Sequence, residues 1–205
     1  MIDFATWRAA WNDLGVEPHE PLHQRLIACW SEKHRHYHTL QHLREVLEGF
    51  EQVRVDAQRP AEIVLALWFH DAIYDLQRND NEQRSAQWAK ESLLQAGLPE
   101  EAAQRLYDLV MATRHDQPPA DPDAQLLVDM DLAILGADRA RFDESDAQVR
   151  REYAHVPEQA YRQGRRAVLR RFLDRPRLYS TGRFHSTLES RARENLQRAL
   201  ARLED

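Results

Sequence analysis

An adjacent histidine and aspartate, His70 and Asp71, directly follow the longest apolar run of the chain, residues 63–69 (IVLALWF). A helix that is apolar on every side is normally buried, and a carboxylate at its end incurs a large desolvation cost unless it is paired. Imidazole and carboxylate together suit Zn, Mn, Fe, Ni or Co, and Mg when oxygen ligands outnumber nitrogen. Two ligands are too few for a tight site, so further ligands are expected elsewhere.

A second group of possible ligands lies upstream, where residues 33–43 (KHRHYHTLQHL) hold four of the ten histidines. His38 and His42 are four positions apart, so on a helix they would share one face about 6 Å apart. They lie beside the apolar stripe of that helix and not opposite it. Both side chains could therefore face a cleft.

A third group lies downstream, in residues 126–136 (LLVDMDLAILG), where two aspartates interrupt an apolar helix pattern. Asp129 and Asp131 project about 200° apart on a helix, so at most one faces the same cleft, and the other caps, pairs or meets solvent. Taken singly, each pattern also has a structural explanation, such as a hydrogen-bonded His-Asp pair or a buried aspartate matched by an arginine. Their order on three separate helices favours one shared metal site.

The order of histidine, His-Asp pair and distant aspartate resembles the HD-domain superfamily of metal-dependent phosphohydrolases over roughly residues 33–136. The phrases RHYHTLQHL, WFHDAIYD, DNEQRSA, DMDLAILG, REYAHV and RARENL are similar to the predicted HD-superfamily phosphohydrolases, which extends the likeness over nearly the whole chain. The resemblance implies an all-α bundle in which His70, Asp71 and Asp131 bind one divalent metal ion (Mn, Co, Ni, Fe, Zn or Mg).

The resemblance leaves the first histidine ligand open. Residues 37–42 (YHTLQH) also resemble the Tyr-His-Asn-x-x-His motif of cyclic-nucleotide phosphodiesterases, in which the later histidine binds metal and the earlier one is a general acid. By this likeness, which we prefer, His42 is a ligand and His38 protonates the leaving oxygen. A simpler HD motif, a histidine followed by Ser or Thr, makes His38 the ligand instead. Thr39 replaces the asparagine, so cyclic-nucleotide specificity is not implied.

The implied reaction is hydrolysis of a small phosphorylated compound, with a nucleotide as one candidate, by metal-activated water that Asp71 or Asp131 orients. Arg35 and His115 are the expected substrate-binding groups for the phosphoryl oxygens. The alternative is a non-catalytic HD module that binds metal and nucleotide. An oxygenase with two irons is disfavoured because only His115 lies between the His-Asp pair and Asp131.

Hydrophobic spacing is helical almost everywhere and no segment alternates convincingly at period two, which predicts an all-α, single-domain helical bundle of the HD type over residues 1–205. The metal-site motifs fall within 33–136, and C-terminal helices over 138–205 complete the bundle. Helices are expected over residues 4–14, 20–32, 40–53, 61–71, 81–96, 100–113, 124–135, 138–154, 158–173 and 187–203.

Composition limits the partners and the compartment. A net charge of −6 argues against nucleic acid as the main partner. No apolar run approaches the roughly 20 residues that cross a bilayer, so no membrane is expected. The sole cysteine, Cys29, rules out an internal disulfide and favours the cytoplasm. Ten arginines between Arg150 and Arg183 predict a solvated helix face or a basic rim that attracts an anionic substrate. The oligomeric state is left open.

Overall fold

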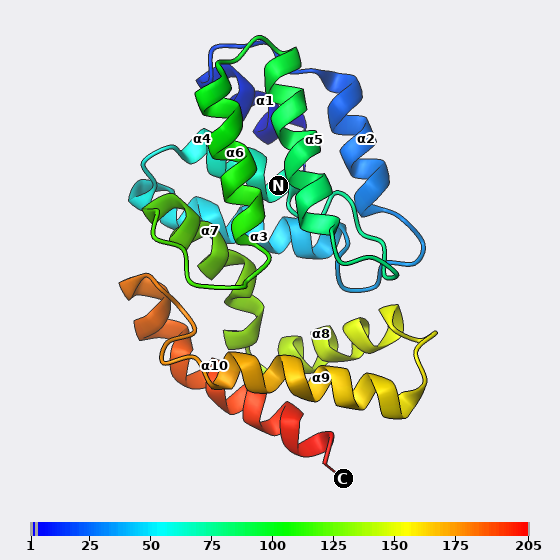
Figure 1. The fold of residues 1–205 in the computed structure, drawn as a ribbon. Helices are drawn as coiled ribbons and strands as arrows, with labels where there is room; N and C mark the ends of the chain where they lie inside the picture. Colours follow the sequence, from blue (N-terminus) through cyan, green and yellow to red (C-terminus); the bar gives the residue numbers. More distant parts are fainter. Residues whose placement is uncertain (1, 3, 205) are drawn as a thin grey trace. The chain divides into compact units, whose positions relative to one another are not determined.

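The computed structural model describes residues 2 and 4–204, and all regular elements in this range are helical (Figure 1). The all-α prediction is therefore confirmed. The chain divides into two compact units, Met1–Met130 and Asp131–Asp205, and each is described by itself. This division does not test the expectation of a single domain, which stays a prediction. Among the described helices, none is both long and apolar enough to span a membrane.

The first unit is built around one buried helix, α4. Its elements are α1 (Phe4–Asp13), α2 (Glu20–Trp30), α3 (Leu40–Val53), the 3-10 turn η1 (Arg54–Asp56), α4 (Pro60–Phe69), α5 (Asn81–Gln95), α6 (Glu100–Ala112) and α7 (Pro122–Asp131). Every residue from Ala61 to Phe69 is buried, and helices α1, α3, α5 and α6 pack against α4. The apolar run that the sequence places before His70 is thus the centre of the core, with α5 and α6 side by side on one flank (Figure 1).

Helix α4 ends at Phe69, two residues earlier than predicted. His70 is its C-cap and Asp71 lies in the turn that follows. The expected helix over 61–71 therefore does not include His70 and Asp71. The carbonyl oxygens of Asp71 and Ala72 accept hydrogen bonds from Arg35, at 2.6 and 3.1 Å, so an arginine distant in sequence holds the turn.

Helix α3 begins at Leu40, as predicted, because Thr39 is its N-cap. The Thr39 hydroxyl accepts a hydrogen bond from the Gln41 N–H at 3.2 Å, which satisfies one of the unpaired donors of the first turn. His38 therefore precedes the helix while His42 lies in its first turn. The expected common helix face of the two histidines is absent for this reason.

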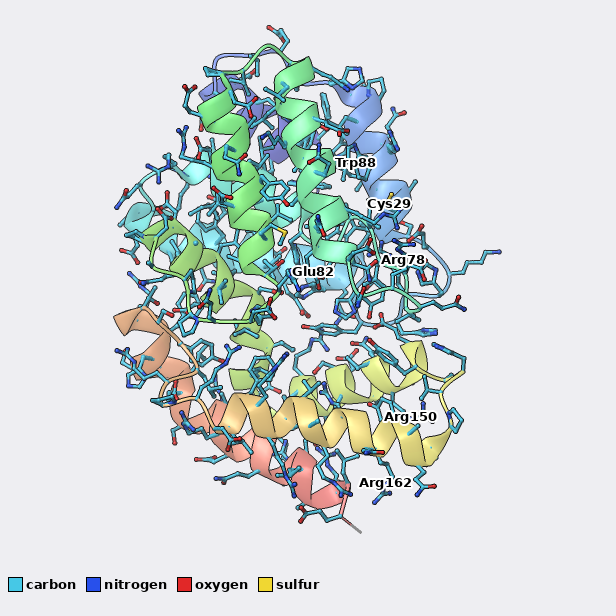
Figure 2. All side chains as sticks on the ribbon, viewed as in Figure 1. Cys29, Arg78, Glu82, Trp88, Arg150 and Arg162 are labelled. Carbon is cyan, nitrogen blue, oxygen red and sulfur yellow. The ribbon has the colours of Figure 1, made fainter. Side chains whose placement is uncertain are left out.

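Four tryptophans belong to the core and are fully buried: Trp7, Trp11, Trp30 and Trp68. The Trp7 ring centroid lies 5.4 Å from those of Trp11 and Trp68. Trp30 Nε1 donates to the Trp68 carbonyl oxygen at 3.0 Å, which ties the end of α2 to the last turn of α4. Trp88, labelled on α5 in Figure 2, is half-buried beneath the guanidinium of Arg25.

The second unit contains η2 (Leu132–Gly136), α8 (Arg139–Glu152), α9 (Glu158–Leu173) and α10 (Gly182–Arg202). Helix α10 starts five residues before the predicted start at 187. Its first two turns hold Gly182, Ser186 and Thr187, which are poor helix formers, and the hydroxyls of Ser186 and Thr187 donate back to the Arg183 carbonyl oxygen. Phe184 is buried and anchors this turn.

At least five of the ten arginines from Arg150 to Arg183 are held by hydrogen bonds within the second unit; two of them, Arg150 and Arg162, are labelled in Figure 2. Arg162 and Arg166 both donate to the Leu203 carbonyl oxygen, at 2.7 and 2.8 Å, near the end of α10. Three more bind carboxylates: Arg150 binds Glu158, Arg165 binds Asp146, and Arg170 binds Glu204. This favours the structural interpretation of the segment over a basic rim.

Candidate metal centre

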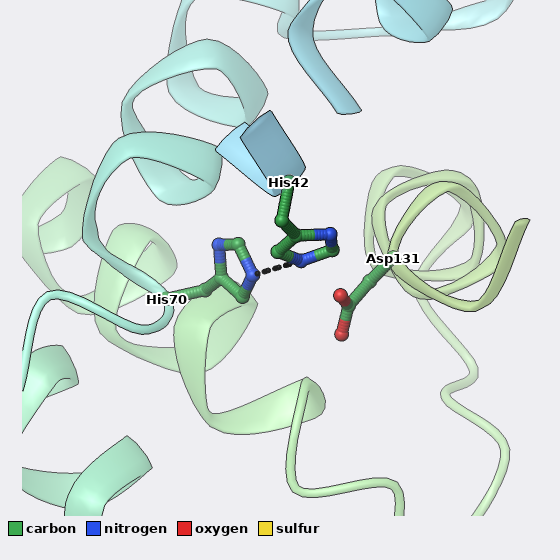
Figure 3. Close-up of side chains that lie close together, drawn as sticks. All are labelled: His42, His70 and Asp131. Carbon is green, nitrogen blue, oxygen red and sulfur yellow. Dashed lines mark hydrogen bonds between the residues drawn. The ribbon is translucent and has the colours of Figure 1, made fainter. Parts of the chain in front are cut away.

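His42, His70 and Asp131 lie together, and one ligand atom from each lies within 4.8 Å of the others (Figure 3). His42 comes from the first turn of α3, His70 is the C-cap of α4, and Asp131 is the last residue of α7. The preceding residues of α7 all belong to the first unit, so that helix positions Asp131. The imidazoles are 2% and 1% exposed, and Asp131 is half-buried. The structure thus brings together residues that are up to 89 positions apart in the numbering.

The backbone sets the protonation of the His70 ring. Its Nδ1 lies 2.8 Å from the Leu67 carbonyl oxygen, and a carbonyl oxygen can only accept. Nδ1 therefore carries the proton, and in the neutral ring Nε2 presents its lone pair to the site. A backbone acceptor behind a metal-binding histidine has this effect in many metal sites, because it fixes both the tautomer and the ring orientation.

The distances around His70 Nε2 fit a transition-metal site. His42 Nε2 lies 3.3 Å away and Asp71 Oδ2 lies 3.1 Å away. With metal–ligand distances of about 2.1 Å, neighbouring ligand atoms are about 3.0 Å apart in octahedral and about 3.4 Å apart in tetrahedral coordination. Two imidazole nitrogens and carboxylate oxygens are also a donor set that Zn, Fe, Co, Ni and Mn accept. The residues present therefore fit a divalent ion.

His38 and Asp71 lie at the edge of this centre. Asp71 Oδ2 is 4.0 Å from His38 Nε2, and the two side chains are 16% and 22% exposed, respectively. The His38 ring packs on Tyr74 and Tyr37, with centroids 4.3 and 4.8 Å away. Of the two candidate first histidines, the structure places His42 in the three-residue group and His38 beside Asp71, nearer to solvent.

Arg35, expected to bind substrate, is 4% exposed and donates four hydrogen bonds to the chain itself. It binds the Glu32 carboxylate through Nε and the carbonyl oxygens of His38, Asp71 and Ala72 through its two Nη atoms. Arg35 therefore holds the segment that carries His38 against the turn that carries Asp71. Its predicted contact with substrate is not tested by this arrangement.

His115 and Glu82 lie outside the three-residue group. His115 follows α6, is half-buried, and has a φ of +56°, which is unusual for a residue other than glycine. Glu82, labelled in Figure 2, lies in the first turn of α5. Burial raises the pKa of the Glu82 carboxyl, and the nearby negative charge of Asp71 raises it further, while Arg114 and His115 oppose this shift. Glu82 is thus close enough to Asp71 and His115 to interact electrostatically.

Two parts of the centre were not predicted from the sequence, the Leu67 carbonyl oxygen and the Tyr74 ring. The three-residue spacing of Leu67 and His70 is compatible with their contact, but only once the end of α4 is known.

Comparison with known proteins adds no relative: no family model, no curated protein and no solved structure matches the chain.

Proposed function

We propose that this chain is a metal-dependent phosphohydrolase of the HD-domain type that acts on a small phosphorylated compound, a nucleotide being one candidate. One observation carries the proposal, the convergence of His42, His70 and Asp131 in the order in which HD-type ligands occur along a chain. The net charge of −6 supports a small substrate over nucleic acid, and the single cysteine supports the cytoplasm as the compartment.

Four residues would hold the ion: His42, His70, Asp71 and Asp131. When bound, a divalent ion would supply electrophilic activation of a phosphoryl oxygen and of water. The two buried imidazoles favour Mn, Fe, Co, Ni or Zn over Mg, which prefers oxygen ligands. The ring proton on His70 Nδ1 stays with the Leu67 carbonyl, so His70 serves as a ligand and does not transfer protons.

His38 is the residue best placed to move a proton. It lies at the edge of the centre, it is more exposed than His42 and His70, and its Nε2 lies 4.0 Å from Asp71 Oδ2. Protonated His38 would donate a proton to the leaving oxygen of the phosphoester. Asp71 would orient the attacking water with a carboxylate oxygen.

The test is to load metal-stripped protein in turn with Mn, Co, Ni, Zn and Mg and to assay nucleotides and generic phosphoesters. We expect hydrolysis by the parent and its loss in Asp131→Asn, which keeps the shape of the side chain and removes its charge. Asp13→Asn is the matched control, because Asp13 is an exposed carboxylate that pairs with Arg54 on α3's C-terminal side.

The outcomes separate the two functions left open by the sequence. If the ion binds with one equivalent per chain and every substrate persists, the non-catalytic module that binds metal and nucleotide replaces the enzyme. If Asp131→Asn and the parent hydrolyse substrate equally, Asp131 has no part in the reaction and the proposed centre is wrong.

A further inference from the structure

A cavity of about 270 Å³ lies at the opposite end of α4 from the metal centre. It is bounded by the start of α4, by α6, by the loop before α7 and by the first turn of α7. Its lining includes Arg59, Arg105, Asp108, Asp121, Leu109 and Ala112. Glu62, which also lines it, precedes His70 by eight residues, or about 12 Å along a helix. The cavity is therefore separate from the metal centre.

Two buried carboxylates fix the arginines of this cavity from behind. Glu62 and Asp123 are 3% and 1% exposed. Arg105 binds Glu62 through Nε at 3.0 Å and through Nη2 at 2.6 Å. The Arg59 Nε lies 3.4 Å from Glu62 and 3.7 Å from Asp123, and Asp123 also accepts the backbone N–H groups of Gln58 and Arg59. The guanidinium groups are thus held in place before any ligand arrives.

Each guanidinium keeps one nitrogen for another partner. Nη1 of Arg59 and Nη1 of Arg105 make no hydrogen bond to any residue that the structure describes, although both side chains line the cavity and are 36% and 42% exposed, respectively. The only other contact of Arg59 in the cavity is a long one, 3.4 Å from Nη2 to Asp121 Oδ2. Directed N–H donors that are oriented by buried carboxylates are the usual means by which arginine binds carboxylate and phosphate.

We propose that this cavity is a binding site for a small organic anion, a carboxylate or phosphate group attached to a short apolar part. The anionic group would accept from Nη1 of Arg59 and Arg105, and the apolar part would lie on Leu109 and Ala112. The volume falls below the range of about 300 to 1,000 Å³ of drug-sized ligand pockets, so the ligand is small. A ligand of about six heavy atoms is expected to bind at about the millimolar level.

Calorimetric and NMR titrations of the metal-stripped full chain test this site with three probes: butyrate, inorganic phosphate and butylammonium. Butyrate and butylammonium share an apolar chain and differ in charge. We expect one equivalent of butyrate or phosphate to bind, with amide shifts at residues 105–112 and 119–124, and no binding of butylammonium. Butyrate alone would identify a carboxylate site, and phosphate alone would identify a phosphate site. The proposal is overturned if neither anion binds or if butylammonium binds as well as butyrate.

Variants locate the binding. Removing Arg105 alone would leave the buried Glu62 with only its longer 3.4 Å contact to Arg59. Both are therefore changed in Glu62→Gln/Arg105→Gln, which should weaken butyrate binding at least tenfold. Ala112→Leu fills the cavity without touching an ion pair and should do the same even if the double variant fails to fold. Arg78→Gln, which removes an arginine paired with Asp80 outside the cavity, is the control. Unchanged affinity in Ala112→Leu would place the anion elsewhere. These titrations use metal-stripped protein and a cavity separate from the metal centre. A failure to bind either anion would therefore leave the phosphohydrolase proposal unchanged.

Discussion

The two units of the chain use polar side chains in opposite ways. In the second unit, hydrogen-bond donors and acceptors are paired with each other around Glu189 and Arg193. Glu189 accepts the backbone N–H groups of Leu178 and Tyr179 and a hydrogen bond from Arg193. Arg193 in turn donates to three carbonyl oxygens, those of residues 173, 175 and 176. Each polar group in this network is matched within the chain, so the network needs nothing else.

At the candidate metal centre, the neutral His70 ring presents an acceptor at Nε2, and the tautomer of His42 decides whether its Nε2 donates to it. His70 Nε2, whose lone pair faces the site, lies 3.1 Å from the Asp71 carboxylate and 3.3 Å from His42 Nε2. Such an arrangement is stable only when a cation or a proton lies between the groups. Matched donors and acceptors therefore indicate a structural role for the Glu189 network, whereas the convergence of His42, His70 and Asp71 supports the proposed binding role of the histidines.

The strongest test of this contrast is His70→Ala. We expect metal affinity to fall by about 1,000-fold, or about 4 kcal/mol, because a central ligand is lost. Addition of Mn, Co or Zn should raise the unfolding temperature of the parent and not that of the variant, since only a folded state that binds the ion is stabilised. Metal content after gel filtration and thermal unfolding followed by circular dichroism measure both effects.

His19→Ala is the matched control, because His19 is exposed and lies before α2, away from the three-residue group. It should bind metal as the parent does. Equal metal content in His70→Ala and the parent would mean that the converging acceptors share a proton and hold no ion, and the contrast between the two units would then disappear.

The converse change in the second unit is Arg193→Ala. It removes the hydrogen bonds to three carbonyl oxygens and to Glu189, so we expect the free energy of unfolding to fall by about 3 kcal/mol. Metal affinity of the folded protein should not change, because these hydrogen bonds involve none of the four residues proposed to hold the ion. Urea unfolding and metal titration measure the two quantities. Arg177→Ala, at an exposed arginine of the same segment, should be neutral, and a parallel loss of metal affinity in Arg193→Ala would contradict the assignment of roles.

The same contrast explains what the sequence could predict. Helices that rest on hydrophobic spacing were placed well, and the bounds of α3 and α9 agree with the prediction because Thr39 and Pro157 mark their starts in the sequence itself. The start of α10 was placed late because Gly182, Ser186 and Thr187 interrupt the apolar pattern. There the buried Phe184 outweighs weak helix propensity, which a local pattern does not reveal.

The candidate centre divides in a similar way. The order of His42, His70 and Asp131 along the chain was enough to predict that they could meet, because each stands next to core sequence. The position of Asp71 in a turn, and not in α4, was not predictable, since it depends on Arg35 reaching across 36 positions to a backbone carbonyl. A common face for His38 and His42 was expected only if both were helical, and His38 precedes the cap Thr39 and so lies outside α3.

A pH-dependent test concerns Glu189, whose side chain is 12% exposed. Burial alone would raise its pKa, but hydrogen bonds from Leu178, Arg193, Tyr179 and His185 outweigh burial and lower the pKa of Glu189 below its ordinary value. The stability that Glu189 contributes is therefore fully present above the unfolded pKa of about 4.3 and is lost as the pH falls through the lower, folded pKa.

We accordingly expect Glu189→Gln to lower the free energy of unfolding by about 2 kcal/mol at pH 7, because charge-assisted hydrogen bonds are lost. The difference from the parent should shrink as the pH falls below about 4. Urea unfolding at pH 7, 5 and 3 measures this trend. A difference that stays constant over this range would show that the charge of Glu189 contributes nothing and that only its shape matters.

The smallest effect on metal affinity or stability is expected from Arg35→Lys. This residue belongs to a hydrogen-bond network, as Arg193 does, and it also lies next to the candidate metal centre. Arg35 is hydrogen-bonded to backbone carbonyl oxygens, as Arg193 is, but it is buried and the carbonyl oxygens belong to the segments carrying His38 and Asp71. Lysine keeps the charge but cannot reach several carbonyl oxygens at once from a planar fork. The positions of Asp71 and His38 should loosen, and metal affinity should fall about tenfold, in the range found for partners outside the ligand shell.

Metal titration by calorimetry measures the Arg35→Lys effect, and Lys33→Ala, at an exposed neighbour on the same segment, is the control. If Arg35 only holds the fold, the free energy of unfolding falls and metal affinity stays at the parent value. If Arg35 binds substrate directly, as expected from its place beside the histidine motif, the Michaelis constant rises while metal affinity is unchanged. Only a loss of metal affinity would indicate that Arg35 positions the metal ligands. Arg35 contacts the backbone of Asp71, whereas the ion would contact the Asp71 carboxylate.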